Sequence, residues 1–181
     1  VHEARRLGLP AAVLTFDPLP QHVLGHTEPV LQLTSLEEKV ALLRRLGVGV
    51  VYVMRFDRRL AALSAEQFAA SVLRRMLRAR MVVVGATHTF GAGGRGNLAT
   101  LRRVGEREGF EVRGVARVTL NGRLVTSTLI RKTISAGRVR EAAQALGRPY
   151  ALQGRVVRGK ARGRTLGFPT LNVACGADRV L

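Results

Sequence analysis

The chain has 181 residues, 46% of them hydrophobic and 4% aromatic, and its formal net charge at pH 7 is +18. This length allows one hydrophobic core, or one domain and part of a second, and no apolar run is long enough to cross a bilayer. The single cysteine, Cys175, excludes an internal disulfide and a multi-cysteine metal site, and we expect its thiol to be inert. The sequence shows no basic-then-apolar leader, so we expect a soluble, cytoplasmic protein.

The positive charge raises the question of polyanionic partners. The 30 Lys and Arg residues against 12 Asp and Glu residues favour contact with nucleic acid, anionic membranes or phosphate-bearing ligands. The arginines are dispersed along the whole chain, however, and the aromatic residues on which single-stranded nucleic acid would stack are scarce. We therefore expect neither a membrane nor a nucleic-acid partner, and keep a basic RNA-binding module as an alternative.

The first half of the chain alternates apolar runs with amphipathic stretches. Prolines in Asp17–Pro20 end the first run, and Ser35 with Glu38 and Ser64 with Gln67 form capping boxes that mark two helix starts. Apolar β-branched runs separated by helices indicate a parallel sheet covered on both sides, and hence an α/β fold. The elements predicted here are strands over residues 11–16, 48–54, 80–85 and 110–115, and helices over residues 35–47, 64–79 and 98–107.

The pattern changes in the second half. Asn121-Gly122 lies between two alternating runs, which is the strongest short-range signal for a β-hairpin. Two short helices are predicted within residues 128–136 and 139–146. After the sequence LGRPY, the pattern becomes strand, glycine-rich turn and strand with no helix between, which is typical of a β-barrel or sandwich. We therefore predict a domain boundary near residues 147–149, between domains over residues 1–147 and 148–181.

The first candidate site is the glycine-rich loop GATHTFGAGGRGN, which begins at Gly85. The carboxyl edge of a parallel sheet is where α/β folds bind ligands, and loop amides there can cradle phosphates, with Arg95 adding charge. A flexible surface connection would explain the glycines nearly as well. We expect His88 to make a polar contact there rather than to act as an acid or a base.

The second candidate site is the stretch TSTLIRK, where a hairpin passes into a helix. Hydroxyls and amides at a helix start, followed by the guanidinium of Arg131, suit a phosphate group. The alternative is ordinary helix capping by Ser127 or Thr128, with Arg131 as a solvated surface charge.

The third candidate site is the stretch GKARGRTLGFPTLN near the end of the sequence. Its glycines allow a backbone to approach a nucleotide closely, and its basic side chains add donors. Thr170 and Asn172 would point to the same face of a strand, and their oxygens suit Mg²⁺. The phosphate-binding candidates of this stretch are Gly159, Lys160, Gly163 and Gly167.

One histidine pair could also bind a metal ion. His22 and His26 are four residues apart and would share one face of a helix, but Pro18, Pro20 and Gly25 argue against a helix at this point. No glutamate accompanies the pair in the pattern of a zinc protease, so we expect no metal site there.

Taken in order, the motifs TFDPLP, LTSLEEK, VVVGATHTFG, TSTLIR, LGRPY and GRTLGFPTLN resemble the prokaryotic bifunctional riboflavin kinase/FMN adenylyltransferase family, also called FAD synthetase. The resemblance spans essentially the whole chain. It implies a Rossmann-like nucleotidyltransferase domain that transfers AMP from ATP to FMN, followed by the start of a flavokinase β-barrel that phosphorylates riboflavin with Mg²⁺ and ATP.

The resemblance also implies roles for particular residues. Ser127, Thr128 and Arg131 match the Ser-Thr-x-x-Arg stretch that handles ATP phosphates. Gly85 to Gly91, including Phe90, match the glycine-containing nucleotide loop. Phe16, Asp17 and Pro18 match a turn beside the active cleft that faces the flavin. Thr170 and Asn172 match the Pro-Thr-x-Asn motif, which assists Mg²⁺-ATP binding in the kinase.

The sequence departs from the family pattern in three respects. The N-terminal strand with its His-x-Gly-His element would precede Val1, and the presumed catalytic glutamate with most of the barrel would follow Leu181, so the catalytic residues stay unassigned. The loop GATHTFG is less acidic than in many members. We therefore expect the sequence to be an internal part of a bifunctional enzyme and to have little activity alone. Whether it associates with itself stays open. The alternative enzyme is another adenylyltransferase of the same superfamily. The motif GRTLGFPTLN argues against it, because those enzymes have no kinase barrel.

Overall fold

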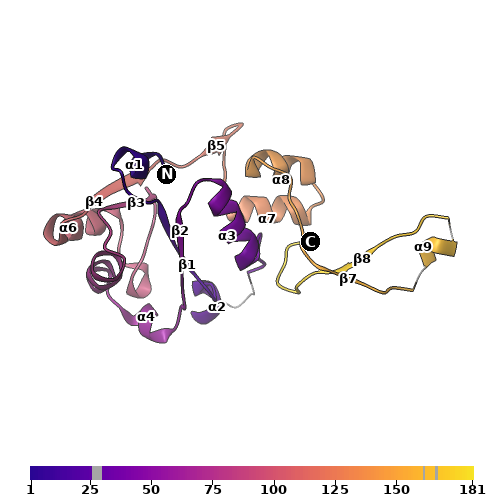
Figure 1. Cartoon of the computed structure of the whole chain (residues 1–181), viewed down its shortest axis with the longest axis horizontal. Coiled ribbons are helices and arrows are strands. Elements are labelled where there is room, and N and C mark those ends of the chain that lie inside the picture. Colours follow the sequence, from indigo (N-terminus) through magenta and orange to yellow (C-terminus); the bar gives the residue numbers. More distant parts are fainter. Residues whose placement is uncertain (26–29, 161, 166) are drawn as a thin grey trace. The chain divides into compact units, whose positions relative to one another are not determined.

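The structure is a computed structural model that describes residues 1–25, 30–160, 162–165 and 167–181. The chain forms two compact units, and each is built from two separate stretches of sequence (Figure 1). Unit 1 comprises Val1–Thr27 and Val48–Leu124, and unit 2 comprises Glu28–Gly47 and Val125–Leu181.

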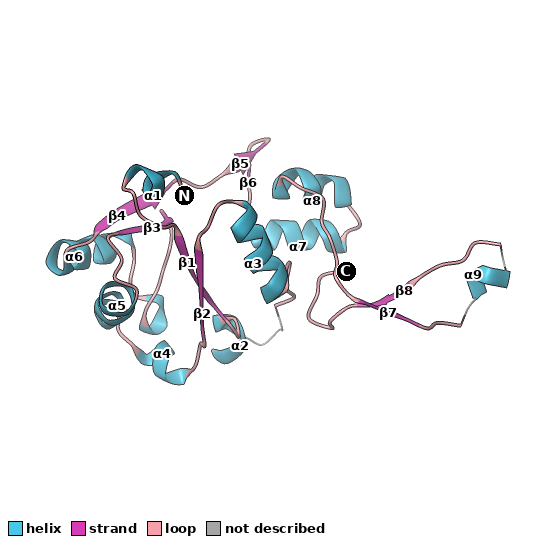
Figure 2. Cartoon of the chain, in the orientation of Figure 1, coloured by secondary structure: helices cyan, strands magenta, loops and turns pink. Residues whose placement is uncertain are grey.

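Two parallel strand pairs form the centre of unit 1 (Figure 2). Strand β1 (Ala12–Phe16) pairs with β2 (Val50–Met54), and β3 (Met81–Gly85) pairs with β4 (Glu111–Val115). The four predicted strands, their parallel direction and the α/β class are therefore confirmed. The prediction of one continuous sheet is not, because the described residues place no strand between β1 and β3 and the two pairs form separate sheets.

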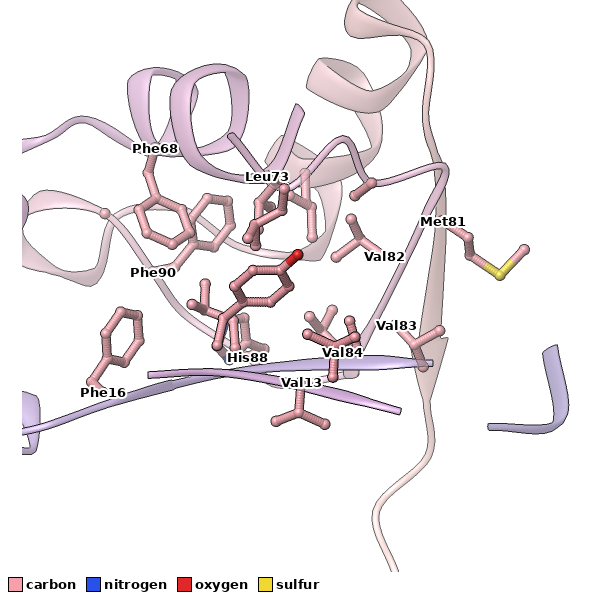
Figure 3. Close-up of a pocket in the computed structure, with 18 of the residues that line it drawn as sticks. Val13, Phe16, Phe68, Leu73, Met81, Val82, Val83, Val84, His88 and Phe90 are labelled. Carbon is pink, nitrogen blue, oxygen red and sulfur yellow. The ribbon is translucent and has the colours of Figure 1, made fainter. Parts of the chain in front are cut away.

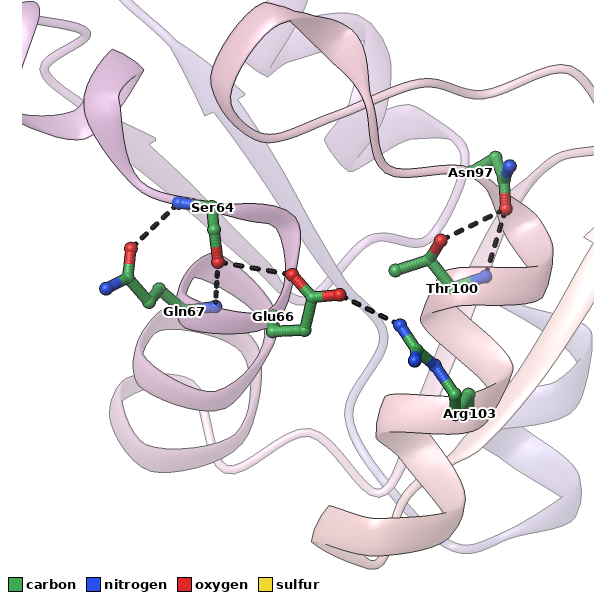
Figure 4. Close-up of polar contacts among 6 residues, drawn as sticks. All are labelled: Ser64, Glu66, Gln67, Asn97, Thr100 and Arg103. Atoms are coloured by element: carbon green, nitrogen blue, oxygen red, sulfur yellow. Dashed lines mark hydrogen bonds and ion pairs between the residues drawn. The ribbon is translucent and has the colours of Figure 1, made fainter.

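Helices connect and cover these strands. Side-chain caps mark several of their starts, and Figure 4 shows two of them: the predicted capping box of Ser64 and Gln67 is present, and the Asn97 side chain accepts the Thr100 N–H at 3.0 Å. An ion pair between Arg103 and Glu66, 2.9 Å long, joins two of these helices. The helices of unit 1 are α1 (His2–Arg6), α2 (Pro20–Val23), α4 (Arg58–Ala62), α5 (Ala65–Phe68), η1 (Ala69–Met76), η2 (Ala92–Gly94) and α6 (Leu98–Glu108).

Two of these helices differ from the prediction. Instead of one α-helix over residues 64–79, the chain forms one α-helical turn, α5, and then a π-helix, η1. The Ser71 hydroxyl donates to the Gln67 carbonyl at 2.5 Å, and such back-bonding competes with the α-helical pattern. Helix α2 was not expected, but Pro20 is its first residue, where no N–H is needed. It contains His22 and ends at Val23, and His26 lies outside the described residues.

The core of unit 1 lies between its helices and the β3–β4 pair. Leu101 and Val104 of α6 are each 1% exposed and pack with Ala69 of η1 and with Phe110. The partly buried side chains around them include Val82 and other residues of β3 and β4. This core fixes the end of β3, and with it the start of the glycine-rich loop.

A short hairpin completes unit 1. Strands β5 (Thr119–Leu120) and β6 (Arg123–Leu124) pair antiparallel. The turn residues Asn121 and Gly122 both have positive φ angles, 51° and 73°, as the predicted Asn-Gly turn requires.

Unit 2 is built on three helices, α3 (Leu36–Arg45), α7 (Ser127–Ser135) and α8 (Val139–Leu146). The predicted capping box of Ser35 and Glu38 starts α3. The core contains Ile130, Ile134 and Ala142, together with Val180 from near the end of the chain. None of the helices in the described ranges is long and apolar enough to cross a membrane.

The rest of unit 2 is an antiparallel pair, β7 (Arg155–Val157) and β8 (Asn172–Ala174). We predicted no helix between these strands, but α9 (Arg162–Thr165) forms one turn there. The Thr165 hydroxyl donates to the Arg162 carbonyl at 2.8 Å, which satisfies an acceptor that the turn leaves free. Every residue of β7 and β8 is exposed, and the described strands form no closed barrel.

Candidate functional site

A cavity of about 1160 Å³ lies in unit 1 between the two strand pairs (Figure 3). Consecutive residues of β1, Ala12–Leu14, and of β3, Met81–Val84, line it. Successive side chains of a strand point to opposite faces, so a run of consecutive lining residues means that the edge of the strand borders the cavity. By contrast, β2 contributes only Val50 and Tyr52. The unpaired edges of β1 and β3 therefore form two walls of this cavity.

The carboxyl end of the cavity is aromatic. In Figure 3, Met81, where β3 begins, lies at one end, whereas Phe16, His88 and Phe90 lie at the other. The ring centroids of Phe68 and Phe90 are 6.0 Å apart. His88 stacks on Phe90, with 5.9 Å between the ring centroids and an angle of 8° between the ring planes. The chain has six Phe and two Tyr, and five of these eight line the cavity. They are Phe16, Tyr52, Phe56, Phe68 and Phe90.

Sequence reasoning missed this aromatic cluster. The low aromatic content indicated that stacking surfaces were scarce, but the fold concentrates the few aromatic rings in one place. A usable signal was present, because Phe16 ends a predicted strand and Phe90 lies in the predicted ligand loop. Both positions lie at the carboxyl edge of the strands, where α/β folds bind ligands.

His88 is the titratable side chain at this end of the cavity. Desolvation by the surrounding atoms lowers the pKa of its imidazole from the ordinary value of 6.5. Its neutral form is therefore favoured at neutral pH, with one ring nitrogen donating and the other accepting. Such a ring can make the polar contact that we predict for it.

The glycine-rich loop is closed and packed. The backbones of Phe90 and Gly96 exchange two hydrogen bonds, of 3.1 Å and 2.9 Å. Gly91 has a φ of +74°, and a Cβ atom there would lie 2.6 Å from the Ala65 backbone nitrogen. The loop is thus folded against the start of α5, which disfavours the alternative of a flexible surface connection.

Not all residues predicted for this loop and cleft reach the cavity. Phe16, Phe90 and Gly91 line it, whereas Gly85 is not among its lining residues. Asp17 and Pro18 are exposed, are joined by a cis peptide bond and also do not line the cavity. The structure therefore brings together only part of the predicted set.

The second candidate site lies at the start of α7 in unit 2. Thr126 caps this helix, because its hydroxyl accepts the Leu129 N–H at 3.1 Å. The alternative of capping by Ser127 or Thr128 is therefore wrong; both are exposed residues of the first turn. The half-buried Arg131 donates from Nε to the Leu31 carbonyl at 2.6 Å. This contact anchors the inner end of the guanidinium, whose Nη1 and Nη2 groups carry its remaining donors.

The third candidate site lies between β7 and β8. A Cβ atom on Gly159 would collide with the Asn172 side-chain amide, and one on Gly163 would lie 3.0 Å from the Thr170 hydroxyl oxygen. These two glycines therefore let the backbone contact the predicted metal-binding side chains. Lys160 is exposed nearby in the sequence.

Thr170 does not lie on a strand, contrary to prediction, because β8 begins at Asn172. Pro169 has no N–H to donate to a strand partner, and the Phe168 N–H is used by the Gly163 carbonyl at 2.8 Å. Gly167 has a φ of +78° with open space around it. The described residues contain no group of three or more His, Cys, Asp or Glu side chains placed to bind a metal ion, and Cys175 is a half-buried free thiol.

Comparison with known proteins identifies the family. Residues 1–129 match the family model described as FAD synthetase, and residues 146–181 match the riboflavin kinase model. The bifunctional riboflavin kinase/FMN adenylyltransferase of Escherichia coli K12 is 37% identical over 94% of this chain and 55% of its own length. The Listeria monocytogenes protein of the same name is 38% identical over 98% of this chain and 56% of its own.

A solved structure agrees with these relatives. The crystal structure named as a macrolide-efflux protein from Streptococcus pneumoniae has a TM-score of 0.86 and 34% identity, covering 96% of this chain and 56% of that one. The chain thus spans about half the length of the proteins it matches. Since the FAD synthetase model covers residues 1–129, well over half of the sequence, the chain belongs to the FAD synthetase family.

Proposed function

We propose that the protein containing this chain phosphorylates riboflavin to FMN and then transfers the AMP group of ATP to FMN, forming FAD. The observation that carries this proposal is the presence, within one chain, of a FAD synthetase match and a riboflavin kinase match. The names of the relatives join the same two activities. The proposed partners are the small molecules riboflavin, FMN and ATP, and the proposed location is the cytoplasm.

The domain division and the finer fold are part of the proposal. Residues 1–147 would form a Rossmann-like nucleotidyltransferase domain and residues 148–181 the start of a flavokinase barrel. A Rossmann-like domain has one parallel sheet. One further parallel strand between the free edges of β1 and β3 would join the two pairs into such a sheet, and the apolar side chains of these edges suit a strand that is buried on both faces.

The aromatic end of the cavity suits a planar ring. Flavin and adenine rings are flat, and aromatic side chains bind such rings through offset or edge contacts. We assign Phe16, with Asp17 and Pro18 beside it, to the flavin side, and the loop containing Gly85, Phe90 and Gly91 to the nucleotide side. His88 adds one donor and one acceptor at the rim, which is the usual composition of a ligand pocket.

The start of α7 is assigned to the ATP phosphates. Ser127 and Thr128 present hydroxyls in the first helical turn, where backbone N–H groups and the helix dipole favour anions. Arg131 adds a guanidinium that can bind phosphate oxygens through two hydrogen bonds. During adenylyl transfer an FMN phosphate oxygen attacks the α-phosphorus of ATP and the bond to pyrophosphate breaks. These groups would stabilise the negative charge that develops on the leaving pyrophosphate.

The β7–β8 segment is assigned to Mg²⁺-ATP in the kinase reaction. Thr170 and Asn172 offer neutral oxygens, and both are exposed on a segment where Gly159 and Gly163 allow close backbone approach. Mg²⁺ prefers oxygen ligands and keeps phosphates and water in its coordination shell, so two protein oxygens fit such an ion. When bound, the ion neutralises phosphate charge. Lys160 and Gly167 are assigned to the same phosphates.

Replacement of Arg131 by alanine should weaken ATP binding about tenfold or more. A hydrogen bond to a charged group contributes about 1.5–3 kcal/mol, and Arg131 would bind phosphate through its Nη groups. Isothermal titration of the 181-residue chain with ATP measures this loss. Lys132→Ala is the matched control, because it removes an exposed cation from the same helix. Equal ATP affinity in Arg131→Ala and Lys132→Ala would remove the role assigned to Arg131.

A further inference from the structure

Two residues near the end of the chain, Arg179 and Val180, are buried in unit 2. The Gln32 N–H donates to the Asp178 carbonyl at 2.6 Å, and the Val180 N–H donates to the Gln32 carbonyl at 3.3 Å. These bonds form a parallel bridge between Gln32 and Arg179. Val180 is 0% exposed and packs in the same core as Ile130 of α7. We call Asp178–Val180 the tail segment; it lies in the riboflavin kinase match, whereas Gln32 lies in the FAD synthetase match.

A buried ion pair fastens the tail segment to α3. Arg179 Nη2 lies 2.7 Å from Glu38 Oε2, and the two side chains are 5% and 10% exposed. The same Glu38 oxygen accepts the Ser35 N–H at 2.7 Å. Arg179 Nη2 also reaches the Leu33 carbonyl at 3.4 Å. The guanidinium thus links the tail segment both to the start of α3 and to the stretch that precedes it.

This ion pair is poorly explained as a device for stability. Arg179 Nε and Nη1 are buried and have no hydrogen-bond partner within the described part of the chain. Unpartnered buried donors are costly, and replacing a buried ion pair by apolar residues of similar size is often neutral or stabilising. A requirement for position, rather than for stability, would account for an arginine at this site.

The stretch that the tail segment holds is also the anchor of Arg131. Arg131 Nε donates to the Leu31 carbonyl. The next residue, Gln32, forms the bridge to the tail segment. Two residues after Leu31, the Leu33 carbonyl contacts Arg179. The Leu31 carbonyl therefore sits in a short extended stretch whose backbone is fixed by the tail segment. Any shift of that stretch changes where the Arg131 guanidinium is directed.

We propose that Arg179 and the tail segment position Arg131 for ATP phosphate, so that the part of the chain matching riboflavin kinase sets the ATP affinity of the part matching FAD synthetase. This inference rests on the role proposed above for Arg131. The tail segment contacts no phosphate itself; it acts through Leu31. The coupling is reciprocal, so bound ATP should in turn stabilise the tail segment in its bridge to Gln32.

The test uses the double variant Glu38→Gln/Arg179→Met, which removes both charges together and leaves neither one buried without its partner. Glutamine keeps the capping box, as the Ser64–Gln67 box in the same chain shows. Arg138→Met is the matched control, because its ion pair with Glu141 is exposed. Thermal unfolding checks that each variant is folded, and isothermal titration measures ATP binding. If the double variant does not fold, Arg179→Lys takes its place, because lysine keeps the positive charge but lacks the planar guanidinium that contacts both Glu38 and Leu33. Its ATP affinity is then compared with that of Arg138→Met.

We expect the double variant to unfold at nearly the native temperature and to bind ATP about fivefold or more weakly, whereas Arg138→Met binds normally. In the Arg131→Ala background the double variant should cause little further loss, since residues acting through one contact are not additive. Native ATP affinity in the double variant, or an equal loss with and without Arg131, would overturn the inference while leaving the Arg131 assignment intact. No effect of Arg131→Ala alone would remove the proposed role of Arg131, and this inference with it.

Discussion

Gly91→Ala is expected to destabilise unit 1 by about 2–6 kcal/mol, the sum of two costs. The backbone of Gly91, at φ 74° and ψ 178°, lies in a region that only glycine adopts readily, and a side chain there costs about 1–3 kcal/mol. The added Cβ would also lie 2.6 Å and 2.7 Å from the Ala65 backbone N and Cα atoms, and overpacking of this kind costs about 1–3 kcal/mol. Chemical denaturation followed by circular dichroism measures the free energy of unfolding.

Two other glycines of the same region separate these costs. Gly93 has a φ of +63° with only ordinary contacts around it, so Gly93→Ala should lose about 1–2 kcal/mol from the backbone term alone. Gly85 has neither a positive φ nor a neighbour within 4 Å of its Cβ position, so Gly85→Ala should leave stability nearly unchanged. Equal unfolding free energies for the Gly91 and Gly85 variants would show that the loop is not packed against Ala65.

Thr170→Val combined with Asn172→Leu is expected to abolish riboflavin phosphorylation and to leave adenylylation of FMN nearly intact. Both changes roughly keep side-chain volume but remove the oxygens proposed for Mg²⁺-ATP. Because the two activities are assigned to different domains, changes at one site should not alter the other. The assay uses a polypeptide of the relatives' full length and measures FMN formed from riboflavin separately from FAD formed from supplied FMN.

Thr119→Val is the control, because it deletes the hydroxyl of an exposed strand residue far from this segment in the sequence. It should change neither rate. A parallel fall of both rates in the Thr170 and Asn172 double variant would show a structural role for the motif. No fall in either rate would show that the motif is not part of the kinase site.

Local signals made much of the fold predictable from the sequence. Capping boxes, the Asn-Gly turn and apolar β-branched runs each depend on residues a few positions apart, and the structure confirms all of them. The departures at η1 and α9 are local too, and each contains a side-chain hydrogen bond, from Ser71 and from Thr165, that no periodic pattern reveals.

The candidate site was predictable only in part, because its remaining features depend on contacts between distant residues. Arg179 contacts the Leu33 carbonyl across 146 positions of sequence, and nothing near either residue indicates the other. The cavity is lined by aromatic rings from β1, β2, α5 and the glycine-rich loop. The positions of His88, Phe90 and Gly91 were predicted from a loop motif, whereas Phe68 borders the cavity only through the packing of α5.

We propose that this chain carries sites for a flavin and for ATP, and equilibrium binding of both ligands to the chain itself decides between this proposal and the alternative of an RNA-binding module. The fluorescence of FMN should fall as the chain is added to it, because the flavin ring would lie against Phe16. Calorimetry should detect ATP binding with a Kd of about 1 mM or below. Phe16→Ala should weaken FMN binding while leaving ATP binding through Arg131 measurable. We expect the chain to bind both ligands, and we expect its affinity for FMN to depend little on salt. Absence of FMN and ATP binding, together with RNA binding that falls steeply with salt, would contradict this proposal.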